Sequence, residues 1–178
     1  DSMDSDGIVS IMRSVDGQIF NGYSHFTSIY DDAVVNSLTR LASKLAEFLR
    51  ADDDIHRVII FSGCGTSGRL AYYCCKAYSV IIPQKNVNFH YLISGGDKAL
   101  VRSQENAEDD PFLGIADLQK ILPKVSSSSS PPSVFFVGIT CGLSAPYVAG
   151  QLDYLMSSEY QNAVCVLLGF NLVSHARD

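Results

Sequence analysis

The sequence predicts an α/β fold, a doubly wound three-layer α/β/α parallel sheet preceded by N-terminal helices. Short apolar runs rich in β-branched residues are each followed by glycine, which is typical of buried parallel strands. Helical segments separate these runs, so strand and helix alternate along the chain. The four expected strands are 58–61, 89–93, 134–137 and 163–168. Ligands of such sheets bind beyond the carboxyl ends of the strands, where we therefore look for function.

Two helices are expected before the first strand, at 8–22 and 31–50. In the second helix apolar residues recur every three or four positions, which is the helical period. We expect residues 1–54 to form a helical segment that packs on a domain made of residues 55–178. The expected helices of that domain are 67–80, 111–122 and 145–157, and Asp110 and Pro111 supply the cap and first turn of the middle one.

The composition excludes several classes of protein. A net charge of -6 without a cluster of Lys or Arg predicts neither a nucleic-acid partner nor a membrane surface. Five cysteines at irregular spacing predict no disulfide framework, and no His stands at metal-ligand spacing from them. We expect Cys64, Cys141 and Cys165 to be small reduced core residues of an intracellular protein. The run 126–130 of five serines predicts an exposed loop.

The first candidate site follows the first expected strand, at Gly63-Cys64-Gly65-Thr66-Ser67-Gly68-Arg69. Its glycines allow backbone amides to approach an anion, and the following helix start adds partial positive charge. Gly65, Thr66 and Ser67 therefore predict a phosphate cradle, although a turn that only caps the helix has the same pattern. The segment also matches G-x-G-x-x-G, but no acidic residue ends the second strand to hold a ribose. The P-loop pattern needs a lysine that is absent here.

A second polar turn, at 138–144, repeats this arrangement after the third strand. Thr140, Gly142 and Ser144 are its candidate ligand residues, and Ser144 alone would suit a helix N-cap. Two such turns at neighbouring strand ends favour a sugar phosphate, which offers one dianion and several hydroxyls. Glu105 and Glu108 supply a third candidate: they could accept bonds from sugar hydroxyls, act as acid and base, or form a solvated acidic face.

With these motifs the chain resembles the group of N-acetylmuramic acid 6-phosphate etherases and glucokinase regulatory proteins. The resemblance rests on Gly-Thr-Ser-Gly-Arg-Leu at 65–70, Ser-Gly-Gly-Asp at 94–97 and Glu-Asn-Ala-Glu-Asp at 105–109. Gly-Leu-Ser-Ala-Pro-Tyr-Val-Ala-Gly-Gln at 142–151 and Gly-Phe-Asn-Leu-Val-Ser-His-Ala-Arg at 169–177 favour the regulatory proteins.

The resemblance implies a sugar isomerase (SIS) domain, one of two in a longer chain. It implies fructose 6-phosphate or fructose 1-phosphate as the ligand, bound without a cofactor. It also implies that the partner is glucokinase, which is a hexokinase-type protein, and that the protein is cytoplasmic or nuclear. By motif, Thr66 and Ser67 match residues that contact the phosphate or the sugar. Glu108 matches a carboxylate that contacts the sugar, and Thr140 and Ser144 match the hydroxyls of the second loop.

One departure from the etherase pattern favours a regulator over an enzyme. The second etherase acid would fall at about Ala77, and alanine cannot move a proton. The first alternative is an etherase-like lyase or sugar-phosphate isomerase. The second, which the residues support less, is a dinucleotide-binding domain.

Overall fold

The computed structural model describes residues 3–50, 55–82, 86–104, 106–122, 131–157, 160, 162–171, 174 and 176. The chain divides into two compact units, Asp1–Ala51 and Asp52–Asp178. Two expectations concern residues outside the described ranges: the exposed loop at 126–130 and the role of Glu105. The packing of residues 1–54 on the domain stays a prediction.

The first unit contains the two expected helices, α1 (Ser5–Asn21) and α2 (Asp32–Arg50). The carboxylate of Asp4 caps α1 by accepting a bond of 2.8 Å from the amide of Gly7. In the link between the helices, the Ser28 hydroxyl donates to the Phe20 carbonyl. Among the described residues, no helix is long and apolar enough to cross a membrane.

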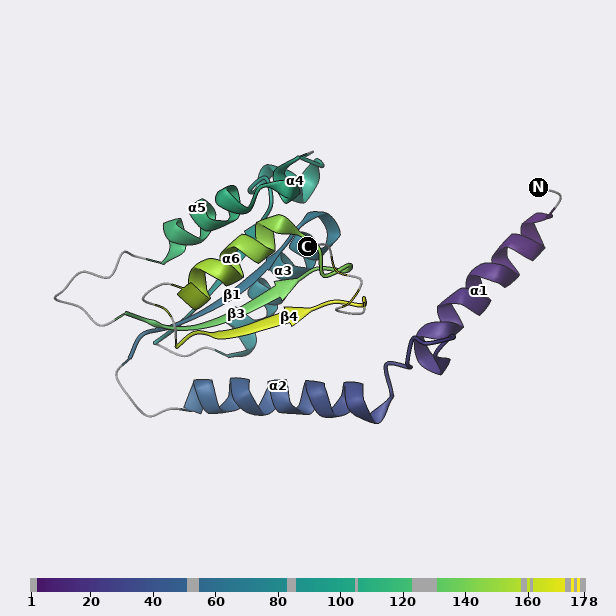
Figure 1. Ribbon diagram of the computed structural model, residues 1–178, viewed down its shortest axis with the longest axis horizontal. Coiled ribbons are helices and arrows are strands. Elements are labelled where there is room, and N and C mark those ends of the chain that lie inside the picture. The colour runs from purple at the N-terminus through teal and green to yellow at the C-terminus, as the bar shows by residue number, and fades with distance from the viewer. Residues whose placement is uncertain are drawn as a thin grey trace. The chain divides into compact units, whose positions relative to one another are not determined.

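The second unit is built on a parallel sheet with strand order β2-β1-β3-β4, of which Figure 1 labels the neighbours β1, β3 and β4. Its strands are β1 (Arg57–Gly63), β2 (Val87–Ile93), β3 (Ser133–Ile139) and β4 (Val164–Leu168). The chain passes from β1 outward to β2, then returns to place β3 on the other side of β1. The carboxyl ends of β1 and β3 therefore form the topological switch point of the sheet, where ligands of such folds bind.

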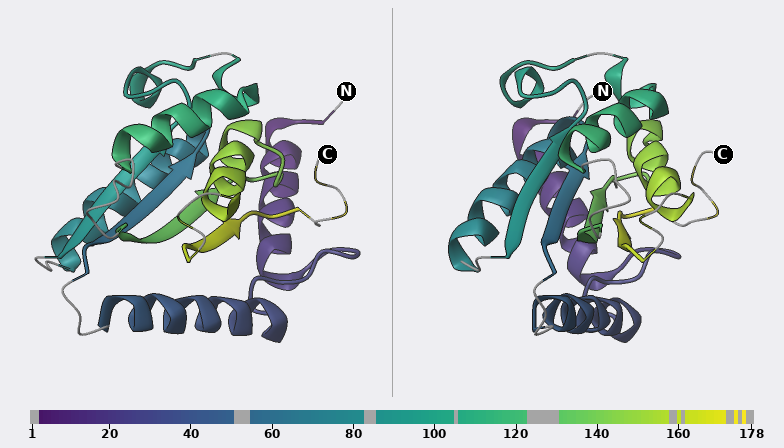
Figure 2. Two further views of the ribbon diagram at one scale, coloured as in Figure 1. Left: turned by 60° about the vertical axis from the view of Figure 1, so that its left-hand side comes forward. Right: turned by 90° about the vertical axis from the view of Figure 1, so that its left-hand side faces the viewer.

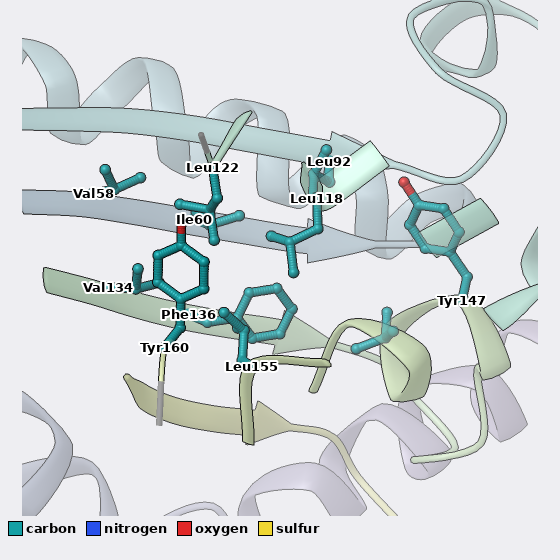
Figure 3. Close-up of a cluster of buried hydrophobic side chains, with 11 residues drawn as sticks. Val58, Ile60, Leu92, Leu118, Leu122, Val134, Phe136, Tyr147, Leu155 and Tyr160 are labelled. Carbon is teal, nitrogen blue, oxygen red and sulfur yellow. The ribbon is translucent and has the colours of Figure 1, made fainter. Parts of the chain in front are cut away.

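Helices cover both faces of the sheet (Figure 2), which confirms the three-layer prediction. On one face lies α3 (Gly65–Ile81), where Tyr78 stacks on Phe61 of β1 with ring centroids 5.9 Å apart. On the other face lie α5 (Pro111–Ile121) and α6 (Pro146–Ser157). A core on that side contains Ile60, Leu118 and Phe136, all fully buried (Figure 3).

Two short elements were not expected from the sequence. A single helical turn, α4 (Lys98–Val101), follows β2, and a 3-10 helix, η1 (Ala107–Asp109), precedes α5. Both are too short to show a helical period, so no apolar pattern could reveal them. They shape the segment that crosses the carboxyl edge of the sheet between β2 and α5.

Two glycines bring α5 and α6 into close contact. A Cβ atom at Gly114 would overlap the carbonyl of Tyr147, and one at Gly150 would overlap the carbonyl of Pro111. In both cases the obstacle is backbone, which cannot move aside as a flexible side chain can. The pair therefore fixes where α6 begins relative to α5.

We predict that Gly150→Ala lowers the free energy of unfolding by about 1–3 kcal/mol, because the added methyl separates α6 from the start of α5. Gly17→Ala in α1 is the matched control, since its Cβ would meet only Asn21 Nδ2 at 3.8 Å. That change should stabilise α1 by about 0.5–1 kcal/mol. Denaturant titration followed by circular dichroism measures both, and equal effects of the two changes would contradict the packing described.

Candidate functional site

A hollow of about 250 Å³ opens at the switch point between β1 and β3. We call it the switch-point hollow. It is lined by Cys64, Ser67, Glu108, Asp109, Ile139, Thr140, Cys141, Gly142, Ser144, Ala145 and Pro146. The fold thus brings together five residues that the sequence predicted from three separate segments: Ser67, Glu108, Thr140, Gly142 and Ser144.

A second hollow, of about 480 Å³, adjoins the first beside α4. We call it the α4 hollow. It is lined by Gly65, Thr66, Arg69, Ser94, Ala99, Ser103, Gln104, Asn106, Glu108 and Asp109. Gly65 and Thr66 line this hollow and not the switch-point hollow. Glu108 and Asp109 line both hollows, so the two spaces share one acidic wall.

The predicted cradle after β1 is the first turn of α3, which begins at Gly65. Cys64 precedes it in an extended conformation, with φ -116° and ψ 147°, and its side chain makes no capping bond. The first amides of a helix have no partner within the helix, and they carry the positive end of its dipole. This uncapped start, with Ser67 beside it, is therefore suited to an anion.

Close packing at this turn requires glycine. A Cβ at Gly63 would lie 2.8 Å from the carbonyl oxygen of Ile139, and one at Gly68 would lie 2.8 Å from the carbonyl oxygen of Gly63. Gly65 has φ +52°, in the left-handed region that glycine adopts without strain. These residues let the first turn of α3 lie directly against the ends of β1 and β3.

The second loop is folded by its own backbone. The amide of Leu143 donates to the carbonyl of Thr140 at 3.2 Å, and the Ser144 hydroxyl donates to the carbonyl of Gly142 at 2.9 Å. Leu143 has φ +56°, a costly conformation for a residue with a branched side chain. The loop therefore holds Thr140 and Ser144 at the hollow in a strained turn.

The segment after β4 supports this loop. The amide of Phe170 donates to the carbonyl of Cys141 at 2.9 Å, and Asn171 Nδ2 donates to the carbonyl of Gly142 at 3.2 Å. Residues 169–177 resemble a family motif, but their sequence alone predicts no contact with the site. The polar Asn171, three residues after the end of β4, was the signal that could have indicated such a role.

The carboxylates of the acidic segment have two different roles, one in capping a helix and the other in lining the hollows. Asp110 caps α5, accepting bonds from the amides of Phe112 at 2.9 Å and Leu113 at 3.0 Å, as predicted. Glu108 and Asp109 instead line the hollows, where carboxylates can accept bonds from hydroxyl groups. Asp109 was not among the predicted site residues because a capping role suited it equally well.

The cysteines are free, but they are not all core residues as expected. Cys75 is buried and Cys165 partly buried, whereas Cys141 is exposed because it lies in the loop beyond β3. Cys64 is partly buried in the switch-point hollow. Burial raises the pKa of its thiol to about 12, and the carboxylates of Glu108 and then Asp109 add to the shift. Cys64 therefore stays protonated at neutral pH.

A third hollow, of about 380 Å³, runs along the edge strand β2. Its two lysines are already engaged, since Lys120 Nζ lies 2.6 Å from Asp117 and Lys76 Nζ lies 5.7 Å from the centre of the Tyr72 ring. It lies beside the sheet and includes neither polar loop. Within the described residues there is no group of three or more His, Cys, Asp or Glu side chains that could hold a metal ion.

Ala77 is exposed on α3 and lines none of the three hollows. It lies 12 residues after Gly65 in the same helix, which at 1.5 Å per residue is about 18 Å along the axis. An acid at position 77 could not reach the switch-point hollow of its own domain. The absence of an acid at Ala77 therefore neither favours nor disfavours catalysis within this domain.

Comparison with known proteins agrees with the fold. The family described as "Glucokinase regulatory protein N-terminal SIS domain" matches residues 40–156. The glucokinase regulatory protein of Xenopus laevis is 36% identical over 184 residues, and that of Homo sapiens is 34% identical over 187 residues. Both alignments cover 100% of this chain and 28% of the relative, so the chain spans just over a quarter of their length.

Bacterial enzymes are similar over a shorter region. The N-acetylmuramic acid 6-phosphate etherase of Halalkalibacterium halodurans is 36% identical over 125 residues, which are 68% of this chain and 38% of the enzyme. The resemblance deduced from the motifs is therefore confirmed for both groups.

We predict that iodoacetamide at pH 8 labels Cys141 long before Cys64. Only the thiolate reacts, and a pKa of about 12 leaves Cys64 with roughly a thousandfold less thiolate than an ordinary thiol. Mass spectrometry of peptides from timed samples measures both rates, and a Cys141→Ser variant serves as control for assignment. Equal labelling of the two residues would contradict the protonated state assigned to Cys64.

Proposed function

This chain belongs to the family of glucokinase regulatory protein N-terminal SIS domains, and on that premise we propose that it senses a phosphorylated sugar and regulates a hexokinase-type kinase. The kinase would be glucokinase, which the names of the relatives specify. The ligand would be fructose 6-phosphate or fructose 1-phosphate, bound without a cofactor.

The switch-point hollow is the observation that carries this proposal. Ser67, in the uncapped first turn of α3, lines it together with Thr140 and Ser144 of the second loop. Helix-start amides and hydroxyls can hold a dianion without a lysine, and the helix dipole adds to their effect. Glu108 and Asp109 on the adjoining wall accept bonds from sugar hydroxyls, which a phosphate alone does not offer.

Regulation requires the sugar to distinguish two states of the protein. A ligand shifts an equilibrium only by the difference between its affinities for the two states. The second loop is a suitable element, because Leu143 is strained and residues 168–171 hold the loop through a few backbone bonds. A dianion at Thr140 and Ser144 would favour one arrangement of that loop and thereby one state of the kinase-binding surface.

The alternative is a lyase or isomerase acting on an amino-sugar phosphate. Two carboxylates, Glu108 and Asp109, line the hollow, and the alignment with one etherase covers 68% of the chain. The regulatory function is favoured because the regulatory proteins match the chain over its whole length. Turnover of N-acetylmuramic acid 6-phosphate by the full-length protein would reverse that preference.

We predict that the full-length protein inhibits glucokinase and that fructose phosphates change the degree of inhibition. A coupled assay of glucose phosphorylation, with and without each fructose phosphate, measures the effect. The kinase alone with the same sugars is the control. No inhibition, or inhibition that both sugars leave unchanged, would refute the regulatory proposal.

We predict that Ser67→Ala and Ser144→Ala each weaken fructose phosphate binding by about 1–3 kcal/mol, the cost of losing a hydrogen bond to a charged group. Isothermal titration calorimetry on the full-length protein measures the affinities. Ser79→Ala is the matched control, because Ser79 lies on the exposed side of α3 and its hydroxyl donates only to the carbonyl of Lys76 at 2.9 Å. Unchanged affinity in both site variants would place the phosphate elsewhere.

A further inference from the structure

We propose that the third hollow, which runs along the edge strand β2, is a docking groove for an extended segment of a partner protein. The segment adds to the sheet as a further strand and brings a carboxylate to Lys76. We call this hollow the β2 groove. The inference is independent of the proposed function, because the groove includes neither polar loop of the switch point.

The backbone of β2 has an outer side without a neighbouring strand, since the strand order is β2-β1-β3-β4. In a strand, successive residues direct their amides and carbonyls to opposite sides. The carbonyl of Asn86 and the amide of Ser94, which flank β2, bond to β1 at 2.8 Å and 3.2 Å, so the even-numbered residues face β1. Phe89 and Tyr91 therefore direct their amides and carbonyls outward, where no strand of the described residues pairs with them.

An extended polypeptide is the ligand that such an edge recognises. Its own amides and carbonyls recur at the same two-residue spacing of about 6.7 Å, so they can pair with those of Phe89 and Tyr91. Natural proteins usually cover or obstruct an exposed edge strand. Here a hollow of about 380 Å³ remains beside residues 89–93 of β2. The main chain of the edge therefore determines the class of the ligand.

Helices α3 and α5 form the two walls of the β2 groove. Cys75 and Lys76 belong to α3, and Asp117, Lys120 and Ile121 belong to α5. Lys120 is held against its own helix, because its Nζ lies 2.6 Å from Asp117 Oδ1. The groove is therefore formed before a partner binds, which lowers the cost of ordering its walls.

Lys76 supplies the charge that selects the segment. Its Nζ lies 5.7 Å from the centre of the Tyr72 ring, and none of the described carboxylates pairs with it. Of the two carboxylates of the groove, Asp117 is already paired with a lysine of its own helix, and Asp97 accepts a bond of 2.7 Å from the Tyr91 hydroxyl. A carboxylate of the incoming segment therefore complements Lys76, whereas a lysine there would be repelled.

A lysine beside an exposed edge strand can also have the opposite effect and prevent pairing. The sequence of β2 favours docking over such protection. The strand Val87–Ile93 contains no proline and no charged residue, and it pairs with β1 without a bulge. Proline, inward charges and bulges are the devices by which edge strands avoid pairing, and β2 itself has none of them.

The test selects peptides from a displayed library of random nonapeptides, with the full-length protein as bait. The recovered peptides are synthesised, and fluorescence anisotropy measures their affinity for the wild type and its variants. Phe89→Pro removes an outward amide without removing a bond to β1, and Phe89→Val is the matched control that keeps this amide. We expect the proline variant to bind about 3–10-fold more weakly than the valine variant.

Variants of Lys76 test the charge of the ligand. The recovered peptides should be rich in β-branched residues and should contain Asp or Glu. We expect Lys76→Glu to weaken their binding by about 3–10-fold and Lys76→Gln to weaken it less, because only glutamate repels the carboxylate.

Hydrogen exchange measured by mass spectrometry supplies a readout that needs no variant. A bound peptide should slow exchange at the amides of Phe89 and Tyr91, which β1 does not protect. The inference is overturned if the library yields no binder, if the proline and valine variants bind the recovered peptides equally, or if exchange at these amides is unchanged. If Phe89→Pro fails to fold, the Lys76 variants and hydrogen exchange decide. None of these outcomes bears on the inhibition of glucokinase, so the inference and the proposed function fail separately.

Discussion

The whole site depends on how closely the first turn of α3 approaches the end of β1. Gly63 and Gly68 lie face to face there, and a Cβ atom on either would meet backbone of the other segment within 3 Å. Because of this contact, the uncapped amides of the helix lie at the switch point of the sheet and not above it. If a side chain at Gly63 or Gly68 displaced the start of α3, that start would no longer adjoin the second loop and Glu108.

Two buried or partly buried hydrogen bonds hold α6 in place at the same edge of the sheet. The Ser62 hydroxyl, one residue before Gly63, donates to Gln151 Oε1 of α6 at 2.5 Å. The Tyr147 hydroxyl donates to Asp117 of α5 at 2.9 Å, and burial together with that carboxylate raises the pKa of Tyr147. Both links are buried or partly buried, where a lost partner is costly. They therefore connect β1, α6 and α5 in one arrangement and keep the two polar turns together.

Sequence periodicity was sufficient for the architecture, because the strands and long helices each show a period or a continuous apolar run. It also located the polar turns, since glycine and hydroxyl residues directly follow the strands. It could not assign Asp109 or Asn171, whose places at the site depend on contacts between segments distant in the sequence. Cys141 was misjudged for the same reason: an apolar neighbourhood in sequence does not reveal that the chain has already left the sheet. The two short helices beside the α4 hollow, α4 and η1, could not be predicted from periodicity either.

Under the proposed function, the dianion of a sugar phosphate binds to the amides and hydroxyls at the switch point, and its sugar binds to the carboxylates of the shared acidic wall. A crystal structure of the full-length protein with fructose 6-phosphate tests this division most directly. The account predicts phosphate oxygens within hydrogen-bonding distance of the Ser67 amide and of the Thr140 or Ser144 hydroxyl. A phosphate bound beside β2, near Lys76 and Lys120, would contradict it.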